Sequence, residues 1–192
     1  MCNRFLSSHN TQSGFTLVEL LVAATIITIL AVAALPQIQS FMVSSKVGSG
    51  NTELQRGLTR MKINAEGNGT TPYTSASSAE FANLMREGSV FTVAGSGADA
   101  TLRHSLVSRG SGPVVVEPAT IVALGDAFTI TMSQVNRGAC PGLAATMQNP
   151  SALIAINGVI VKPLGGRYDG PTATKACNST NTDDNTFVFT VQ

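Results

Sequence analysis

Several residue types that enzymes and nucleic-acid-binding proteins depend on are scarce in this 192-residue sequence. Charged residues make up 12% of it, about half the usual share in globular proteins. Lys and Arg number 12 and Asp and Glu number 11, so no strongly basic surface for nucleic acid is expected. There is no tryptophan, and the only histidines are His9 and His104. The composition argues against a nucleic-acid-binding protein and against an enzyme that depends on histidine.

The few histidines and cysteines also leave no obvious catalytic or metal centre. A Ser-His-Asp site would have to use His104, and a solvated loop histidine is the simpler interpretation of that residue. Cys140 and Cys177 are 37 positions apart and have no flanking ligands to complete a zinc site. Residues 183–185, Asp-Asp-Asn, could contact calcium, but a polar turn before a last strand is the preferred explanation. We therefore expect no catalytic residue, no metal and no cofactor.

One long apolar run is present, GFTLVELLVAATIITILAVAAL, from Gly14 to Leu35. From Phe15 onward it holds 21 residues and a single ionisable side chain, Glu19. As a helix these residues span about 30 Å, enough to cross the hydrocarbon core of a bilayer. An unpaired carboxylate there costs on the order of a few kcal/mol, so Glu19 indicates a function. A plain single-pass anchor explains neither the glycine before the run nor the glutamate within it.

Gly-Phe-Thr-Leu-Val-Glu followed by a long apolar run resembles the amino terminus of type IV pilins and pseudopilins. In that family a leader ending in glycine is removed, and the new first residue, usually phenylalanine, is N-methylated. The resemblance implies prepilin peptidase cleavage between Gly14 and Phe15, methylation of Phe15, and a role for Glu19 in assembly. Pro36 falls where the family commonly has a helix-kinking proline. The implied fold is the type IV pilin fold, an α+β fold whose long N-terminal helix packs on an antiparallel β-sheet.

These features divide the chain into four expected parts. Residues 1–14 are a cleaved leader, 15–36 a transmembrane and polymerisation helix, and 37–65 the amphipathic half of the same helix. Residues 66–192 are a globular region with an αβ-loop, a β-sheet and a disulfide-bounded C-terminal region. Arg4 favours the cytoplasmic side for the leader. The precursor is therefore expected in the inner membrane with its C-terminal domain outside the cytoplasm, before it enters an extracellular filament.

The apolar pattern of a helix continues beyond Pro36. Residues three, four or seven positions apart form an approximate stripe, which predicts a helical face laid against a sheet; its members are Ile38, Phe41, Val43, Val47, Leu54, Leu58 and Met61. Gly48 and Gly50 interrupt this helix, and each weakens it by about 1 kcal/mol. They are either soft points at which the helix bends inside a filament or places where another element packs closely.

The second half of the sequence carries the pattern of a sheet. Residues 127–133 and 186–191 alternate apolar and polar side chains, as half-buried strands do. Between two short apolar runs stands Asn157-Gly158, the strongest two-residue signal of a β-hairpin. These segments predict an antiparallel arrangement that includes the C-terminal strand.

Removal of the leader takes Cys2 away and leaves Cys140 and Cys177 as a pair. In the oxidising compartment beyond the inner membrane they are expected to form a disulfide, with two unrelated buried thiols as the alternative. This part of the chain also resembles type IVb pilins of the plasmid thin-pilus and toxin-coregulated kind, in which a disulfide encloses a variable loop region. The bridge is expected to hold the last strand on the sheet and to display residues 165–174 as a surface loop.

The expected function is structural: a type IV pilus subunit that polymerises through its N-terminal helix, for adhesion, aggregation, conjugation or motility. Its expected partners are other copies of the chain, the prepilin peptidase and methyltransferase, and the assembly machinery and lipid of the inner membrane. A minor pilin or a pseudopilin of type II secretion is the alternative within the family. A membrane-tethered binding domain, such as a DNA-uptake receptor, is the rival class. Without the leader, 11 Lys plus Arg face 11 Asp plus Glu, so no specific nucleic-acid partner is expected.

Overall fold

The computed structural model describes residues 14–67, 69–179 and 184–192. The chain divides into two compact units, Met1–Gln37 and Ile38–Gln192, and helix α1 (Leu17–Ala65) has residues in both. Apart from Gly14, the expected leader lies outside the described residues, and so do the three residues singled out within it, Cys2, Arg4 and His9. Pro36 lies within α1, and the kink expected there stays a prediction.

In the first unit, the described residues form an apolar helical segment. Residues 17–34 have a mean hydropathy of 2.5 and are long enough to cross a membrane, and none of them is buried. Thr16 begins the helix, because its hydroxyl accepts a hydrogen bond from the Glu19 amide at 3.2 Å. The hydroxyls of Thr25 and Thr28 donate to carbonyls of the preceding turn. These threonines satisfy their polar groups within the helix, as a segment in lipid must.

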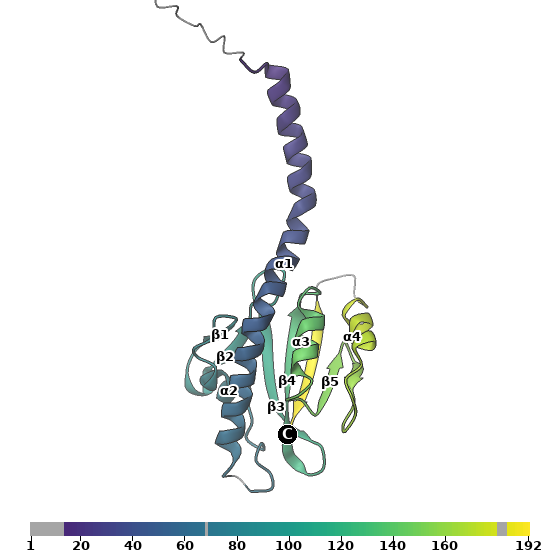
Figure 1. Cartoon of the computed structure of the whole chain (residues 1–192). Coiled ribbons are helices and arrows are strands. Elements are labelled where there is room, and N and C mark those ends of the chain that lie inside the picture. The colour runs from purple at the N-terminus through teal and green to yellow at the C-terminus, as the bar shows by residue number, and fades with distance from the viewer. Residues whose placement is uncertain (1–13, 68, 180–183) are drawn as a thin grey trace, which may run out of the picture. The chain divides into compact units, whose positions relative to one another are not determined.

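In the second unit, the described strands form one seven-stranded antiparallel sheet in the order β1-β2-β3-β4-β7-β5-β6 (Figure 1). The strands are β1 (Phe91–Ala94), β2 (Thr101–His104), β3 (Gly112–Thr120), β4 (Leu124–Val135), β5 (Leu153–Ile156), β6 (Val159–Lys162) and β7 (Asn185–Val191). The C-terminal strand β7 lies between β4 and β5 and pairs with both. The end of the chain therefore joins the long β3–β4 pair to the short β5–β6 hairpin.

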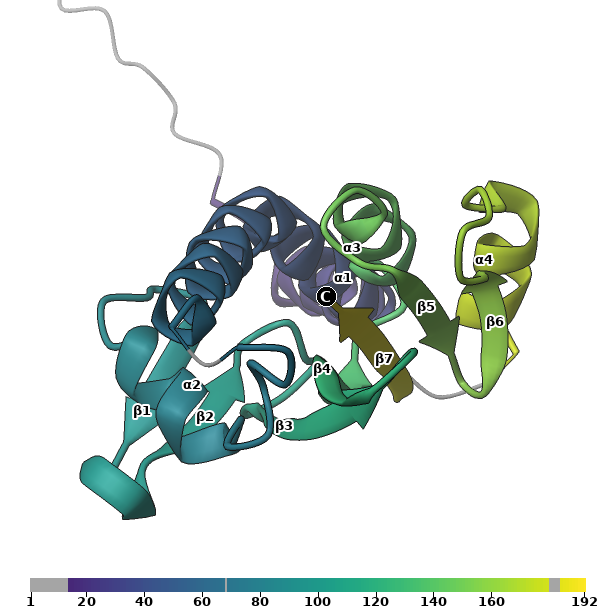
Figure 2. The same ribbon diagram turned by 90° about the horizontal axis from the view of Figure 1, so that it is seen from below.

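Apart from α1, the helices described in this unit are short. They are α2 (Ser78–Leu84), the 3-10 turn η1 (Gly97–Asp99), α3 (Cys140–Met147) and α4 (Gly170–Cys177). Figure 2 shows α1 and α3 on the same face of the sheet. Leu54 and Leu58 of α1 join Phe128, Phe187 and Phe189 of the central strands in one buried cluster. The aromatic side chains of β4 and β7 thus form the surface on which α1 rests.

The predicted apolar stripe is confirmed from Val43 to Met61, whose members are buried. It is wrong for Ile38 and Phe41, whose side chains are 53% and 76% exposed. The periodicity of α1 continues through these residues, but the buried face begins only at Val43, where the globular region starts to cover the helix. The spacing of apolar residues predicts a helix face correctly and cannot say how far a partner extends along it.

The two glycines in this part of α1 have different surroundings. A Cβ atom on Gly50 would lie 3.0 Å from Cγ1 of Val90, so this glycine permits close packing. A Cβ atom on Gly48 would meet nothing within 4 Å. Close packing therefore explains the glycine at position 50, but it does not explain the glycine at position 48.

The predicted hairpin is confirmed: β5 and β6 are joined at Asn157-Gly158, both with positive φ, as a type I′ turn requires. The surface loop expected at residues 165–174 is partly wrong, because α4 begins at Gly170. The Asp169 carboxylate accepts a hydrogen bond from the Thr172 amide at 3.2 Å, and Pro171 stands in the first turn. An N-cap and a proline in this arrangement are helix-start signals.

Candidate assembly surface

The apolar surface of α1 is the first candidate site. Every side chain from Phe15 to Ala34 is exposed, and those of Phe15 and Leu17 are each 80% exposed. A soluble monomer rarely leaves so extended an apolar surface in water. This segment requires lipid or other helices around it.

Glu19 lies within that surface and three residues after Thr16, which caps the helix. Phe15 lies four residues before Glu19 and just outside the helix, which begins after Thr16. A Cβ atom on Gly14 would meet nothing within 4 Å, so packing in the described chain does not require glycine there. The sequence Gly14-Phe15 is thus exposed and open beside the only ionisable side chain of the apolar segment.

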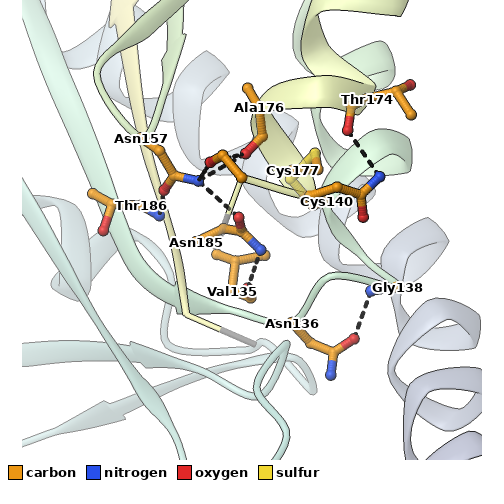
Figure 3. Close-up of a disulfide and its surroundings, with 12 residues drawn as sticks. Val135, Asn136, Gly138, Cys140, Asn157, Thr174, Ala176, Cys177, Asn185 and Thr186 are labelled. Carbon is orange, nitrogen blue, oxygen red and sulfur yellow. Dashed lines mark hydrogen bonds between the residues drawn. A yellow bond between two sulfur atoms is a disulfide. The ribbon is translucent and has the colours of Figure 1, made fainter. Parts of the chain in front are cut away.

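The structure brings Cys140 and Cys177 together in a disulfide with a Cα–Cα distance of 5.8 Å, as predicted (Figure 3). Cys140 is the first residue of α3 and Cys177 the last of α4, and both are fully or almost fully buried. The bridge therefore fixes the start of one helix to the end of the other.

A network of side-chain amides lies beside this disulfide (Figure 3). The Asn157 side chain donates to the Ala176 carbonyl at 2.9 Å and to Oδ1 of Asn185 at 2.8 Å. Asn185, at the start of β7, donates in turn to the Val135 carbonyl at 3.1 Å. The Asn185 side-chain amide is thus engaged inside the protein. Asp183, of the calcium site considered for residues 183–185, lies outside the described residues.

Two family models match the sequence that folds in this way. The prokaryotic N-terminal methylation motif matches residues 9–35, and the PilS N-terminal model matches residues 49–192. The chain belongs to the PilS family of pilins. No match was found among curated proteins.

A solved crystal structure agrees with this assignment. This pilin is similar to the crystal structure of the type IVb pilin from Salmonella typhi, with 27% identity and a TM-score of 0.53 over 74% of this chain and 97% of that one. An NMR structure of the type IVb pilin PilS from the same organism matches with 24% identity and a TM-score of 0.45, over 75% and 94%. The chain has the type IV pilin fold, and its role is that of a structural pilin subunit.

His104 corrects one prediction for this pilin. The residue lies in β2 with no exposed surface, so the expectation of a solvated loop histidine is wrong. Nε2 lies 2.9 Å from the Ser133 carbonyl, and Nδ1 accepts a hydrogen bond from the Leu106 amide at 3.2 Å. Burial lowers the pKa of His104 to about 4, against the opposing effect of the Ser133 carbonyl. The ring is a neutral core group with both nitrogens occupied by backbone.

Glu53 of α1 makes a structural contact that the sequence did not reveal. Its carboxylate accepts hydrogen bonds from the amides of Ser89, Val90 and Phe91 at 2.7, 3.0 and 3.0 Å. Burial raises the pKa of Glu53, but the hydrogen bonds from these residues outweigh it and leave the pKa below its usual value. A Cβ atom on Gly88 would lie 2.6 Å from this carboxylate. Glu53 therefore fastens α1 to the segment that leads into β1, and glycine lets that segment approach.

Proposed function

We propose that this pilin is a major subunit of a surface filament and that it polymerises through its N-terminal helix. The observation that carries this proposal is the apolar surface from Phe15 to Ala34, which is exposed throughout and includes Glu19. Packing against the N-terminal helices of other subunits would bury this apolar surface. The disulfide-bounded C-terminal region supports a major, surface-exposed subunit over a minor pilin or a pseudopilin.

The chain first enters the inner membrane as a precursor with the unit Ile38–Gln192 outside the cytoplasm. A prepilin peptidase cuts between Gly14 and Phe15, and the new amine of Phe15 is methylated. The open surroundings of Gly14 support this step, because the glycine is then needed by the peptidase and not by the fold. The mass of the membrane form tests it: the expected chain begins at Phe15 and carries one added methyl group, and a retained leader would refute it.

Glu19 supplies the specificity of assembly. A lone carboxylate in lipid is unfavourable, and the cationic amine of Phe15 is the partner that processing creates. In a filament, the amine of an incoming subunit meets Glu19 of a subunit already in place. Because the pair forms at only one stagger of the two helices, it sets the axial register and favours assembly over the free membrane form.

The charge of Glu19 is tested by Glu19→Gln, which keeps the shape and hydrogen-bonding capacity of the side chain. We expect normal cleavage and membrane insertion, with filaments sharply reduced when the variant is the only subunit. Thr28→Gln is the matched control, since it places the same amide on the exposed helix and leaves Glu19 intact. Filaments of wild-type abundance from Glu19→Gln cells would show that charge pairing is not the function of this residue.

Electron microscopy of cells that lack this chain separates a major subunit from the alternatives. We expect filaments to be absent; unchanged filament number and length would support a minor pilin or pseudopilin instead. Filter binding of the protein to DNA at moderate salt tests the rival binding function. We expect no retention, because positive and negative charges nearly cancel in this chain.

A further inference from the structure

The turn between β3 and β4 forms an apolar tip, here defined as residues 121–124, Ile-Val-Ala-Leu. The side chains of Val122 and Leu124 are 85% and 76% exposed, and Val122 is the most exposed large apolar side chain in the part of the chain that the structure describes. Turns are usually built from Gly, Pro, Asn, Asp and Ser, which serve their geometry better. The geometry of this turn therefore does not explain its apolar side chains.

The apolar tip is held in a fixed conformation. The Asp126 carboxylate accepts hydrogen bonds from the amides of Ile121, Val122 and Ala123 at 2.8, 2.7 and 2.9 Å. The Gly125 carbonyl accepts a further one from the Tyr73 amide at 2.9 Å, which ties the tip to the segment after α1. A surface that is already ordered loses little conformational entropy on binding. The tip is thus prepared for contact with another molecule.

A groove between α3 and α4 is a concave surface of the same unit. It has a volume of about 850 Å³ and lies beside the disulfide that joins these two helices. Figure 2 shows α3 and α4 next to each other on the face of the sheet that also carries α1. Pro141, Ala145, Tyr168 and Pro171 give the groove apolar surface, and Gly170, Thr174, Lys175 and Asn178 line the rest of it.

The tip and the groove lie toward opposite ends of the second unit. A Cβ atom on Gly142 of α3 would lie 3.2 Å from Cγ1 of Val47, in the early part of the covered helix. The tip lies at the end of the sheet where α1 finishes at Ala65 (Figure 1). From Val47 to Ala65 the helix advances about 27 Å at about 1.5 Å per residue. The two surfaces are therefore separated along α1 by most of the length of the covered helix.

We propose that the apolar tip of one subunit docks in the α3–α4 groove of the next subunit along the filament. The surfaces differ and lie toward opposite ends, so the contact is head-to-tail and always leaves one tip and one groove free. Such a heterologous contact extends into an open helical polymer when it does not close into a ring. A second copy of this chain is the occupant, because the chain itself carries both the projecting and the concave apolar surface. The inference rests on the proposed polymerisation and specifies a contact within it.

Cysteine cross-linking in intact filaments tests the contact. The double variant Leu124→Cys/Ala145→Cys places one thiol on the tip and one in the groove. After oxidation of sheared filaments we expect a ladder of multimers on a non-reducing gel, which collapses to monomer on reduction. The matched control Val115→Cys/Ala145→Cys moves the first thiol from the tip to β3, where the Val115 side chain is 41% exposed, and should remain monomeric. Co-expression with wild-type subunits keeps filaments available if the variant alone assembles poorly.

A second pair of variants measures what the tip contributes. We expect Val122→Ser/Leu124→Ser to lower the yield of sheared filaments at least tenfold, and Val115→Ser to leave it near wild type. Normal filaments with only monomers from the tip and groove cysteines would overturn this contact and leave polymerisation intact. Absence of filaments from wild-type cells would overturn polymerisation and this contact together.

Discussion

Acidification to about pH 5 is expected to destabilise this pilin through His104, because the folded protein keeps that ring neutral. The ring is fully buried in β2, with Nε2 against the Ser133 carbonyl and Nδ1 accepting from the Leu106 amide. A proton on Nδ1 would remove the acceptor for Leu106 and place a charge in the core. The unfolded chain has no such restriction.

The magnitude follows from the two pKa values of the ring. Burial lowers the pKa of His104 from 6.5 to about 4 in the folded state. As the pH falls through the unfolded pKa, the unfolded chain binds a proton and the folded chain does not. The free energy of unfolding therefore decreases by about 1.4 kcal/mol per pH unit, or by about 2 kcal/mol at pH 5. The loss reaches about 3 kcal/mol near pH 4, where the folded ring also protonates, and it is absent above pH 7.

Urea unfolding of the purified chain without its leader, in a mild detergent and at several pH values between about 7.5 and 5, measures this slope. His104 is then the only histidine in the chain. His104→Gln lowers stability at every pH, because the fit in the core is disturbed, but the slope between pH 6.5 and 5 should disappear. A wild-type protein whose stability does not change in this window would refute the reasoning, and so would a variant that keeps the full slope.

Further substitutions test contacts that hold the second unit together, with urea unfolding as the common assay. Glu53→Ala should lower the free energy of unfolding by about 3 kcal/mol, because it leaves the amides of residues 89–91 without their acceptor; a loss below about 0.5 kcal/mol would contradict the role given to this carboxylate. Replacing either cysteine of the disulfide by serine should cost about 4 kcal/mol for a 37-residue separation, and equal midpoints with and without reductant would contradict this. Gly57→Ala should destabilise the protein by about 1–3 kcal/mol, because its Cβ would collide with Phe81 and Met85 of the α2 region, whereas Gly48→Ala, with open space around it, should stabilise the helix by about 1 kcal/mol. Equal effects of the two alanines would show that packing does not distinguish these positions.

The N-terminal helix could be predicted because its signals are local. A glycine, a phenylalanine, a glutamate and an apolar run are meaningful through their order and spacing alone, and residues 17–34 form the helix that this order predicts. The pairing of Cys140 with Cys177 was equally accessible, since the expected loss of Cys2 leaves no other combination. The hairpin at Asn157-Gly158 follows from the positive φ angles that these two residue types tolerate.

Other features depend on which distant segments meet. His104 is one residue in a short polar-flanked strand, and nothing in its neighbours along the chain shows that the Ser133 carbonyl and the Leu106 amide will enclose it. In the sequence, Glu53 resembles any charged residue on the outer face of a helix. The three amides that donate to it lie 36 to 38 positions further along the chain. The exposure of Ile38 and Phe41 was missed for the same reason, because their periodicity is correct but no sheet covers them.

The order of adjacent residues thus sufficed to predict the apolar helix, its single carboxylate and the glycine before it. These features depend on the order of neighbouring residues and do not require the folded second unit. The folded structure was needed to show which polar groups are buried, how far α1 is covered, and that an apolar tip and an α3–α4 groove lie toward opposite ends of the second unit. The physical reason is that burial and shape arise when the β3–β4 pair, the C-terminal strand and the disulfide-linked helices come together, and those contacts join residues far apart in the chain.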